Sequence, residues 1–259
     1  MNTTWPTGGW RCTRYTASFS PGAALYIRGV TKRLLLLLAV LVLVGVMGVP
    51  WLYGQFLEGA PDPALALPAE QHRAGTDIDG VWVVTEGPDE ESKRSQVGYR
   101  ADQQLLWKTV TVDGRTNDVS GRVVITGTTL RSADFVVNVS SMQSPHHGRD
   151  EKFRSADVMA ADKFPTAHLK VTEDVDLSGV PASGAPTTIE VPAELTLKGV
   201  TRQVAVQLDV QRSGDQVNAA GQIPVVFSDF AVNPPAPFAG LLQVQPVVTI
   251  EFLLTLVKQ

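Results

Sequence analysis

Two runs of alternating apolar and polar residues meet at Lys198 and Gly199. A period of two is typical of a strand with one buried and one solvated face. A glycine at the junction supplies the positive φ that a tight hairpin turn needs. The pattern therefore predicts an antiparallel hairpin, and its apolar face consists of Ile189, Val191, Ala193, Leu195, Leu197, Val204, Val206, Leu208 and Val210.

The same alternation recurs in shorter segments on both sides of this hairpin. Further strands are predicted at 81–84, 96–100, 119–125, 129–140, 167–171, 216–226 and 245–257. Short loops connect most of them. About eight strands joined in this way favour an all-β, antiparallel barrel that closes on itself, because an open sheet would leave exposed edges.

The alternation is lost between residues 143 and 163. We interpret this segment as a connection with a short helical turn at 155–161. The turn should end before Phe164, because a residue that precedes a proline avoids the helical region. A connection of this length in an all-strand domain is usually functional or closes one end of a barrel.

A long apolar segment precedes the predicted barrel. Residues 34–53 carry no charge and are long enough, as a helix, to span the hydrocarbon core of a bilayer. We expect a cytoplasmic tail at 1–33, a transmembrane anchor at 34–56, a semi-extended linker at 57–76 and a barrel domain at 77–259. A cleaved signal peptide fits less well, because its apolar core is usually shorter.

Charge supports this orientation. Five of the 22 basic residues and none of the 26 acidic residues precede residue 58. Basic residues before an apolar span place the N-terminus in the cytoplasm and the barrel outside it. The acidic remainder argues against nucleic acid as a partner. The only cysteine, Cys12, lies in the tail, so the barrel is expected to fold without a disulfide.

The chain lacks the common catalytic motifs. It has no G-x-S-x-G, H-E-x-x-H or C-x-x-C motif and no glycine-rich phosphate loop. His146 and His147 are adjacent, and we interpret them as a solvated pair in a loop. The sequence therefore predicts a protein that is not an enzyme and has no metal or cofactor. A hydrolase built on residues 143–163 is the least favoured alternative.

Four short motifs follow one another in a recognisable order. They are Arg149-Asp150, residues 153–157 (Phe-Arg-Ser-Ala-Asp), residues 163–167 (Lys-Phe-Pro-Thr-Ala) and residues 195–201 (Leu-Thr-Leu-Lys-Gly-Val-Thr). In this order they resemble the YceI-like family, over about residues 80–257. One departure is that residues 97–124 contain no histidine, whereas the family carries one there.

The resemblance implies a lipocalin-like barrel that binds a polyisoprenoid lipid, such as a quinone or a prenyl phosphate, in an elongated cavity. It also implies that Arg149 or Arg154 holds the head group while Asp150 fixes the loop. The candidate lining residues are Phe135, Val137, Leu195, Leu197, Val204, Val206, Phe252 and Leu254, with Tyr99, Trp107, Phe164, Phe227 and Phe230 near the ends. Phe153 is a further candidate for contact with the lipid.

The periodicity alone leaves alternatives open. Inward apolar positions suit a packed core as well as a cavity, so a cell-envelope interaction module with a solid barrel is the rival function. Arg149 and Asp150 could likewise form an exposed ion pair of little energetic importance. A homodimer is compatible with the sequence, although no dimer face can be recognised in it.

Overall fold

The computed structural model describes residues 33–45, 48, 61–87, 94–105, 108–234 and 242–259. It divides into two compact units, residues 1–51 and 52–259. Residues 33–45 are helical, and none of the described helices is both long and apolar enough for a membrane crossing. The predicted tail lies outside the described residues except for residue 33, and so do residues 46–47 and 49–56 of the predicted anchor.

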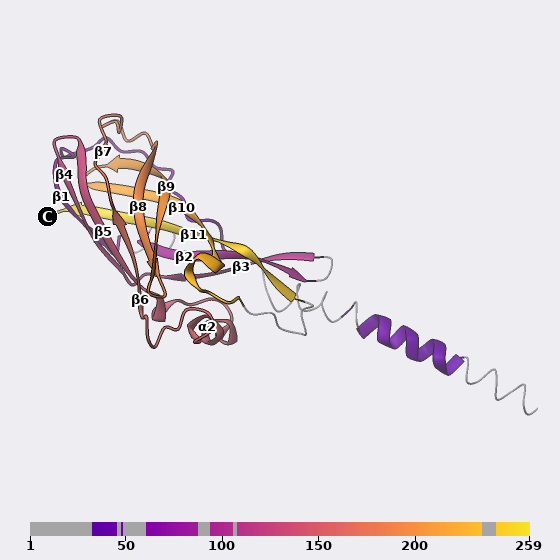
Figure 1. Cartoon of the computed structure of the whole chain (residues 1–259). Helices are drawn as coiled ribbons and strands as arrows, with labels where there is room; N and C mark the ends of the chain where they lie inside the picture. The colour runs from indigo at the N-terminus through magenta and orange to yellow at the C-terminus, as the bar shows by residue number, and fades with distance from the viewer. Residues whose placement is uncertain (1–32, 46–47, 49–60, 88–93, 106–107, 235–241) are drawn as a thin grey trace, which may run out of the picture. The chain divides into compact units, whose positions relative to one another are not determined.

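The regular secondary structure described in the second unit is mostly strand (Figure 1). In chain order they are β1 (Gly80–Thr85), β2 (Gln96–Leu105), β3 (Lys108–Thr116), β4 (Val119–Thr126), β5 (Thr129–Asn138), β6 (Thr166–Val171), β7 (Val175–Asp176), β8 (Thr187–Leu197), β9 (Val200–Ser213), β10 (Gln216–Val226) and β11 (Leu242–Lys258). The described part of this unit also contains the α-helix α2 (His147–Arg154) and the 3-10 turns η3 (Val139–Ser141) and η4 (Phe227–Phe230).

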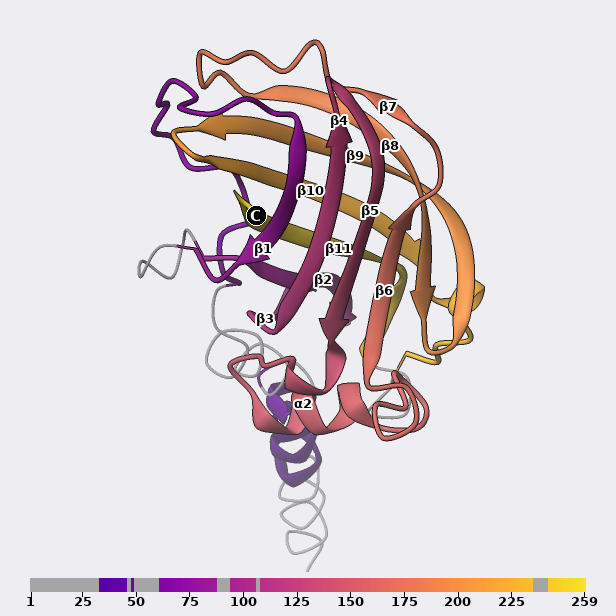
Figure 2. The same cartoon turned by 90° about the vertical axis from the view of Figure 1, so that its left-hand side faces the viewer.

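Eight of these strands close into a ring. The order is β1-β4-β5-β6-β8-β9-β10-β11, and β1 closes the ring by pairing with both β4 and β11. All of these pairings are antiparallel. The hairpin of β2 and β3 attaches to the first part of β11, and α2 lies across one end of the barrel (Figure 2). The predicted closed antiparallel barrel with a short helix is confirmed.

The hairpin predicted around Lys198 and Gly199 is confirmed in detail. Strands β8 and β9 pair from Thr187↔Val210 to Leu197↔Val200, which leaves a turn of two residues. Both turn residues have positive φ, 49° for Lys198 and 75° for Gly199. Two consecutive positive φ values are typical of the turn whose twist matches that of the flanking strands.

Two local predictions differ from the structure. The helix lies at His147–Arg154, before the predicted turn at 155–161, and Ser155 is its C-cap. Strand β3 was not predicted, although Val110 and Val112 alternate with Thr109 and Thr111 along it. The alternating pattern within β3 is short. The strand is stabilised by its pairing with the neighbouring strand β2 over nine residue positions.

The described part of the predicted linker is not a free spacer. Residues 61–76, which we call the strap, pack against the outside of the barrel. Leu65 is buried against Leu253 and Ala220, and the backbone of Ala74 forms a bridge with Gly214. The strap packs on the barrel because it carries apolar side chains among its prolines. Burial of these side chains is more favourable than their exposure to water in an extended spacer.

The strap covers a charged cluster on the outer face of β2, β3 and β11. Glu251 is fully buried and accepts hydrogen bonds from Arg100 and Arg115, at 3.2 and 3.0 Å. The backbone nitrogen of Leu65 donates to the same carboxylate at 3.4 Å. Nearby Asp113 is almost fully buried as well, and this burial raises its pKa above the usual value.

Candidate functional site

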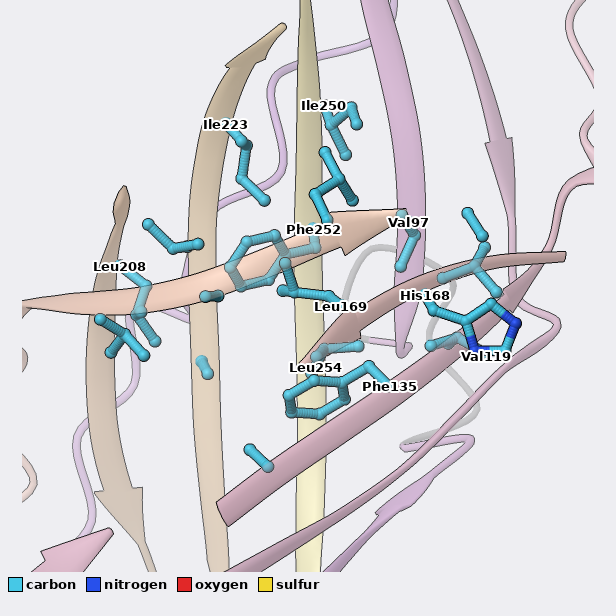
Figure 3. Close-up of a pocket in the computed structure, with 18 of the residues that line it drawn as sticks. Val97, Val119, Phe135, His168, Leu169, Leu208, Ile223, Ile250, Phe252 and Leu254 are labelled. Atoms are coloured by element: carbon cyan, nitrogen blue, oxygen red, sulfur yellow. The ribbon is translucent and has the colours of Figure 1, made fainter. Parts of the chain in front are cut away.

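An apolar cavity of about 260 Å³ lies inside the barrel. Every strand of the closed ring contributes lining residues, as expected for a barrel in which alternate side chains point to the interior. Figure 3 shows some of these residues, which come from several strands. Ten of the predicted contact residues line it: Tyr99, Phe135, Val137, Phe153, Leu195, Leu197, Val206, Phe227, Phe252 and Leu254.

Other predicted lining residues lie elsewhere. Val204 is only partly buried against the core and does not line the cavity, and Phe230 is buried in η4. Phe164 packs over the turn at Gly199, whose missing Cβ leaves room for the ring. Trp107 lies outside the described residues. Phe164 and Phe230 are candidates by their position in the chain alone, so no periodic pattern predicts the direction of their side chains.

Several lining residues were missed by the sequence reasoning. Trp82 and Ile78 line the cavity together, and the indole nitrogen of Trp82 donates to the backbone oxygen of Ile78 at 2.8 Å. Met142, Val158 and Met159 reach the cavity from the segment on either side of α2. That segment has no strand periodicity, so the sequence offered no signal for the direction of these side chains.

The lining is almost free of polar side chains. Tyr99, Trp82 and His168 carry the polar side-chain groups among the lining residues. The Trp82 indole is already bonded, and His168 is exposed and forms a 3.0 Å hydrogen bond with Thr166. A buried polar ligand group would lose its hydrogen bonds with water and find few replacements here. The cavity is therefore suited to hydrocarbon.

Two aromatic side chains stack at the end of the barrel next to α2. Tyr99 of β2 stacks on Phe153 of α2, with ring centroids 5.0 Å apart and an interplanar angle of 7°. Both rings line the cavity and are only partly buried. The stack joins the barrel wall to the helix at this end.

The polar residues of α2 hold the connection between β5 and β6 in place. Asp150 is buried, and its Oδ1 accepts hydrogen bonds from the backbone nitrogen and the hydroxyl of Ser144, at 2.9 and 2.6 Å. Arg154 donates to the backbone oxygen of Met142 at 3.3 Å. Asp150 thus fixes the loop, and Arg149 lies on the same helix without lining the cavity.

The histidines of this region do not form a recognisable metal site. His146 is the N-cap of α2 and His147 is its first residue. Across the described ranges, no three His, Cys, Asp or Glu side chains are grouped closely enough to hold a metal ion.

The comparison with known families identifies this barrel. The model of the YceI-like domain matches residues 90–256, which is more than half of the chain. The chain belongs to the YceI-like family. The match includes the 149–157 motifs and the β8–β9 hairpin, and it begins after β1.

Curated relatives of the chain are UPF0312 proteins. One from Vibrio cholerae is 30% identical over 130 residues, which cover 47% of this chain and 65% of the relative. Another from Pseudomonas aeruginosa is 33% identical over 105 residues, 39% of this chain and 50% of the relative. The chain therefore spans less than two thirds of the curated relatives that it matches.

Two solved structures share the fold. One is described as a polyisoprenoid binding domain from Saccharophagus degradans implicated in plant cell wall breakdown. It has a TM-score of 0.55 at 18% identity, over 69% of this chain and 98% of that chain. The other, BcnA from Burkholderia cenocepacia, has a TM-score of 0.50 at 21% identity, over 62% of this chain and 95% of that chain. At these identities the likeness concerns the fold.

Proposed function

We propose that this YceI-like protein binds the hydrocarbon chain of an isoprenoid lipid inside its barrel. The observation that carries the proposal is the cavity, whose lining is apolar along its length. Transfer of each CH₂ group of a chain from water into such a site is favourable by about 0.8 kcal/mol. The binding described for the Saccharophagus degradans domain, which has the same fold, also supports this proposal.

The size of the cavity limits how much of a chain it holds. A cavity of roughly 150 Å³ accommodates benzene, with its six carbons. By proportion, the 260 Å³ found here corresponds to about ten carbons, or two isoprene units. A longer chain would extend out of the cavity or require the walls to move. The polar head group would then remain outside, where water can solvate it.

The arginines of α2 are candidates for a contact with the head group. Phe153 of this helix lines the cavity. Arg149 and Arg154 belong to the same helix and are near neighbours of Phe153 in the sequence. Guanidinium groups bind phosphate oxygens well. Both arginines are therefore candidates, and Arg154 also donates to the backbone oxygen of Met142. Binding of a prenyl phosphate and of the matching prenyl alcohol to Arg149→Gln would test this contact.

Mass spectrometry of lipids extracted from the purified full-length protein tests the main proposal. We expect a prenyl lipid in the wild type and its loss in Leu169→Trp, because Leu169 lines the cavity and is only partly buried. Lys170→Trp is the matched control, since Lys170 is exposed on the outer face of the same strand. Absence of a prenyl lipid from the wild type, even after feeding with one, would refute the proposal.

We propose further that residues 34–56 anchor the protein in the cell membrane with the barrel outside the cytoplasm. The uncharged segment and the basic residues before it support this topology. A membrane-impermeant maleimide should label Cys12 only after the cells are opened. It should label an added cysteine at the exposed position Ser178 in intact cells, and labelling of Cys12 in intact cells would contradict the proposal.

The rival function, an interaction module with a solid barrel, gains no specific support from the structure, because the interior contains a cavity. It would be favoured if the wild type carried no lipid and retained a salt-sensitive protein partner. The homodimer stays a prediction, which the native mass of the same preparation tests.

A further inference from the structure

Three aromatic residues that line the cavity share an unusual neighbour. Each lies directly opposite a glycine on the adjacent strand, in the same register position. Because cross-strand partners point to the same side of a sheet, all three glycines also face the interior. The pairs are Tyr99↔Gly114, Phe135↔Gly121 and Phe252↔Gly221.

The rings occupy the space that a side chain on the glycine would take. A Cβ on Gly121 would lie 2.8 Å from Cε1 of Phe135, and one on Gly114 would lie 2.6 Å from Cε1 of Tyr99. Real Cβ atoms essentially never approach a neighbour within 3.0 Å. The rings therefore lie down over the backbone of the neighbouring strand. A glycine in a strand commonly marks such a close approach.

This arrangement affects the width of the cavity. An aromatic side chain that stands upright in a narrow barrel fills much of its interior, whereas one that lies along the wall leaves the centre open. Figure 3 shows the rings of Phe135 and Phe252 among the aliphatic side chains of the pocket. At the α2 end, the Tyr99 ring uses the space above Gly114 and stacks on Phe153.

We propose that these aromatic–glycine pairs keep the barrel hollow and set the cross-section of the chain that it accepts. The inference rests on the proposed binding of an isoprenoid. A methyl side chain at Gly121 would push the Phe135 ring into the cavity. A methyl-branched prenyl chain is wider than a straight alkyl chain, so it would lose more affinity when the cavity narrows.

The three pairs differ in how cleanly they can be tested. A Cβ on Gly221 would also lie 2.8 Å from the backbone oxygen of Gln207, so an alanine there would strain the wall itself. At Gly114 the closest atoms all belong to the Tyr99 ring. At Gly121 the closest backbone atom is the oxygen of Asp134, 3.1 Å from the Cβ, which is a less severe contact than the one at Gly221. Gly114→Ala and Gly121→Ala are therefore the more informative variants. Gly179→Ala is the matched control, because nothing lies within 4 Å of a Cβ at this position.

The experiment measures binding of farnesol and of 1-pentadecanol, which both have fifteen carbons, to the full-length protein. We expect Gly121→Ala to weaken farnesol binding about tenfold or more, as for other overpacked interiors. The loss for 1-pentadecanol should be smaller, and Gly179→Ala should bind both like the wild type. The double variant Gly121→Ala with Phe135→Leu should regain farnesol binding, which separates narrowing from misfolding.

Unfolding under pressure measures the cavity without any ligand. The volume decrease on unfolding scales with the internal void that disappears, so it should be smaller for Gly121→Ala than for the wild type. An unchanged volume and unchanged farnesol binding would overturn the inference. If the wild type binds neither alcohol, the proposed lipid function fails, and the pressure result alone decides whether the glycines hold the barrel open.

Discussion

Replacement of Glu251 by glutamine should destabilise the barrel far more than loss of a surface charge. The carboxylate is fully buried and lies in one row with Gly98 and Arg115 across β11, β2 and β3. The Arg115 side chain reaches over Gly98, where a Cβ would come within 2.9 Å of it, to donate to Glu251 at 3.0 Å. Arg100 donates to the same carboxylate at 3.2 Å.

The expected size of the effect follows from this geometry. Removing one partner of a buried ion pair costs about 3–5 kcal/mol, because the remaining charge is left without compensation. Both arginine side chains are 20% exposed, so water partly solvates them. We therefore expect a loss of unfolding free energy at the lower end of this range, about 3 kcal/mol. For a domain of this size, that corresponds to a decrease in Tm of roughly 6–12 °C.

Urea unfolding of the full-length protein, followed by tryptophan fluorescence, measures the free energy of unfolding. Asp174→Asn is the matched control, because Asp174 pairs with Arg131 at the surface, where both side chains are about half exposed. Such a pair contributes about 1 kcal/mol or less. If Glu251→Gln lowered the free energy of unfolding no more than Asp174→Asn, the buried carboxylate would not compensate the charges of Arg100 and Arg115 as described.

Three further predictions use the same unfolding assay. The folded-state pKa of Asp113 is raised by burial, so its charged form costs stability at neutral pH. Asp113→Asn should stabilise the protein at pH 7, and this gain should shrink as the pH falls through the raised pKa of the folded state towards the usual pKa of an aspartate. Leu65→Ala should lower the free energy of unfolding by about 2–3 kcal/mol, because Leu65 loses its packing on Leu253. The strap should then be cleaved more readily by proteases, and an unchanged rate of cleavage would contradict its packing on the barrel. Asp150→Ala should lower the free energy of unfolding by about 1–3 kcal/mol, because the two donors of Ser144 lose their acceptor. Adding Ser144→Ala to this variant should lower it little further, because both changes remove the same interaction.

The strands and their inward faces could be predicted from the sequence. Along β8 and β9, the alternation that ends at Leu197 and resumes at Val204 matches the burial of the two strands. Period-two patterning is a property of each strand by itself, so it can be read without knowledge of its neighbours. The turn at Lys198 and Gly199 is equally local, because positive φ favours glycine at its second position.

The pairing between distant segments could not be predicted in this way. The alternating pattern of β3 is short, and the strand is held by pairing with β2 and by the contact of the strap with Asp113. The strap itself carries only Leu65 and Leu67 as packing residues, and their burial depends on Leu253, almost two hundred residues away along the chain. The local sequence of the strap shows that it is rich in proline and polar residues. It does not show which surface of the barrel the strap covers.

The sequence by itself determined that this chain forms an antiparallel barrel of the YceI-like type with apolar residues facing inward. Only the tertiary structure decided that the interior is hollow. The same alternating pattern fits a packed core, and the difference depends on register, which places Gly121 opposite Phe135 and Gly221 opposite Phe252. Because register is set jointly by all the strands of a closed sheet, no single segment of the sequence contains it.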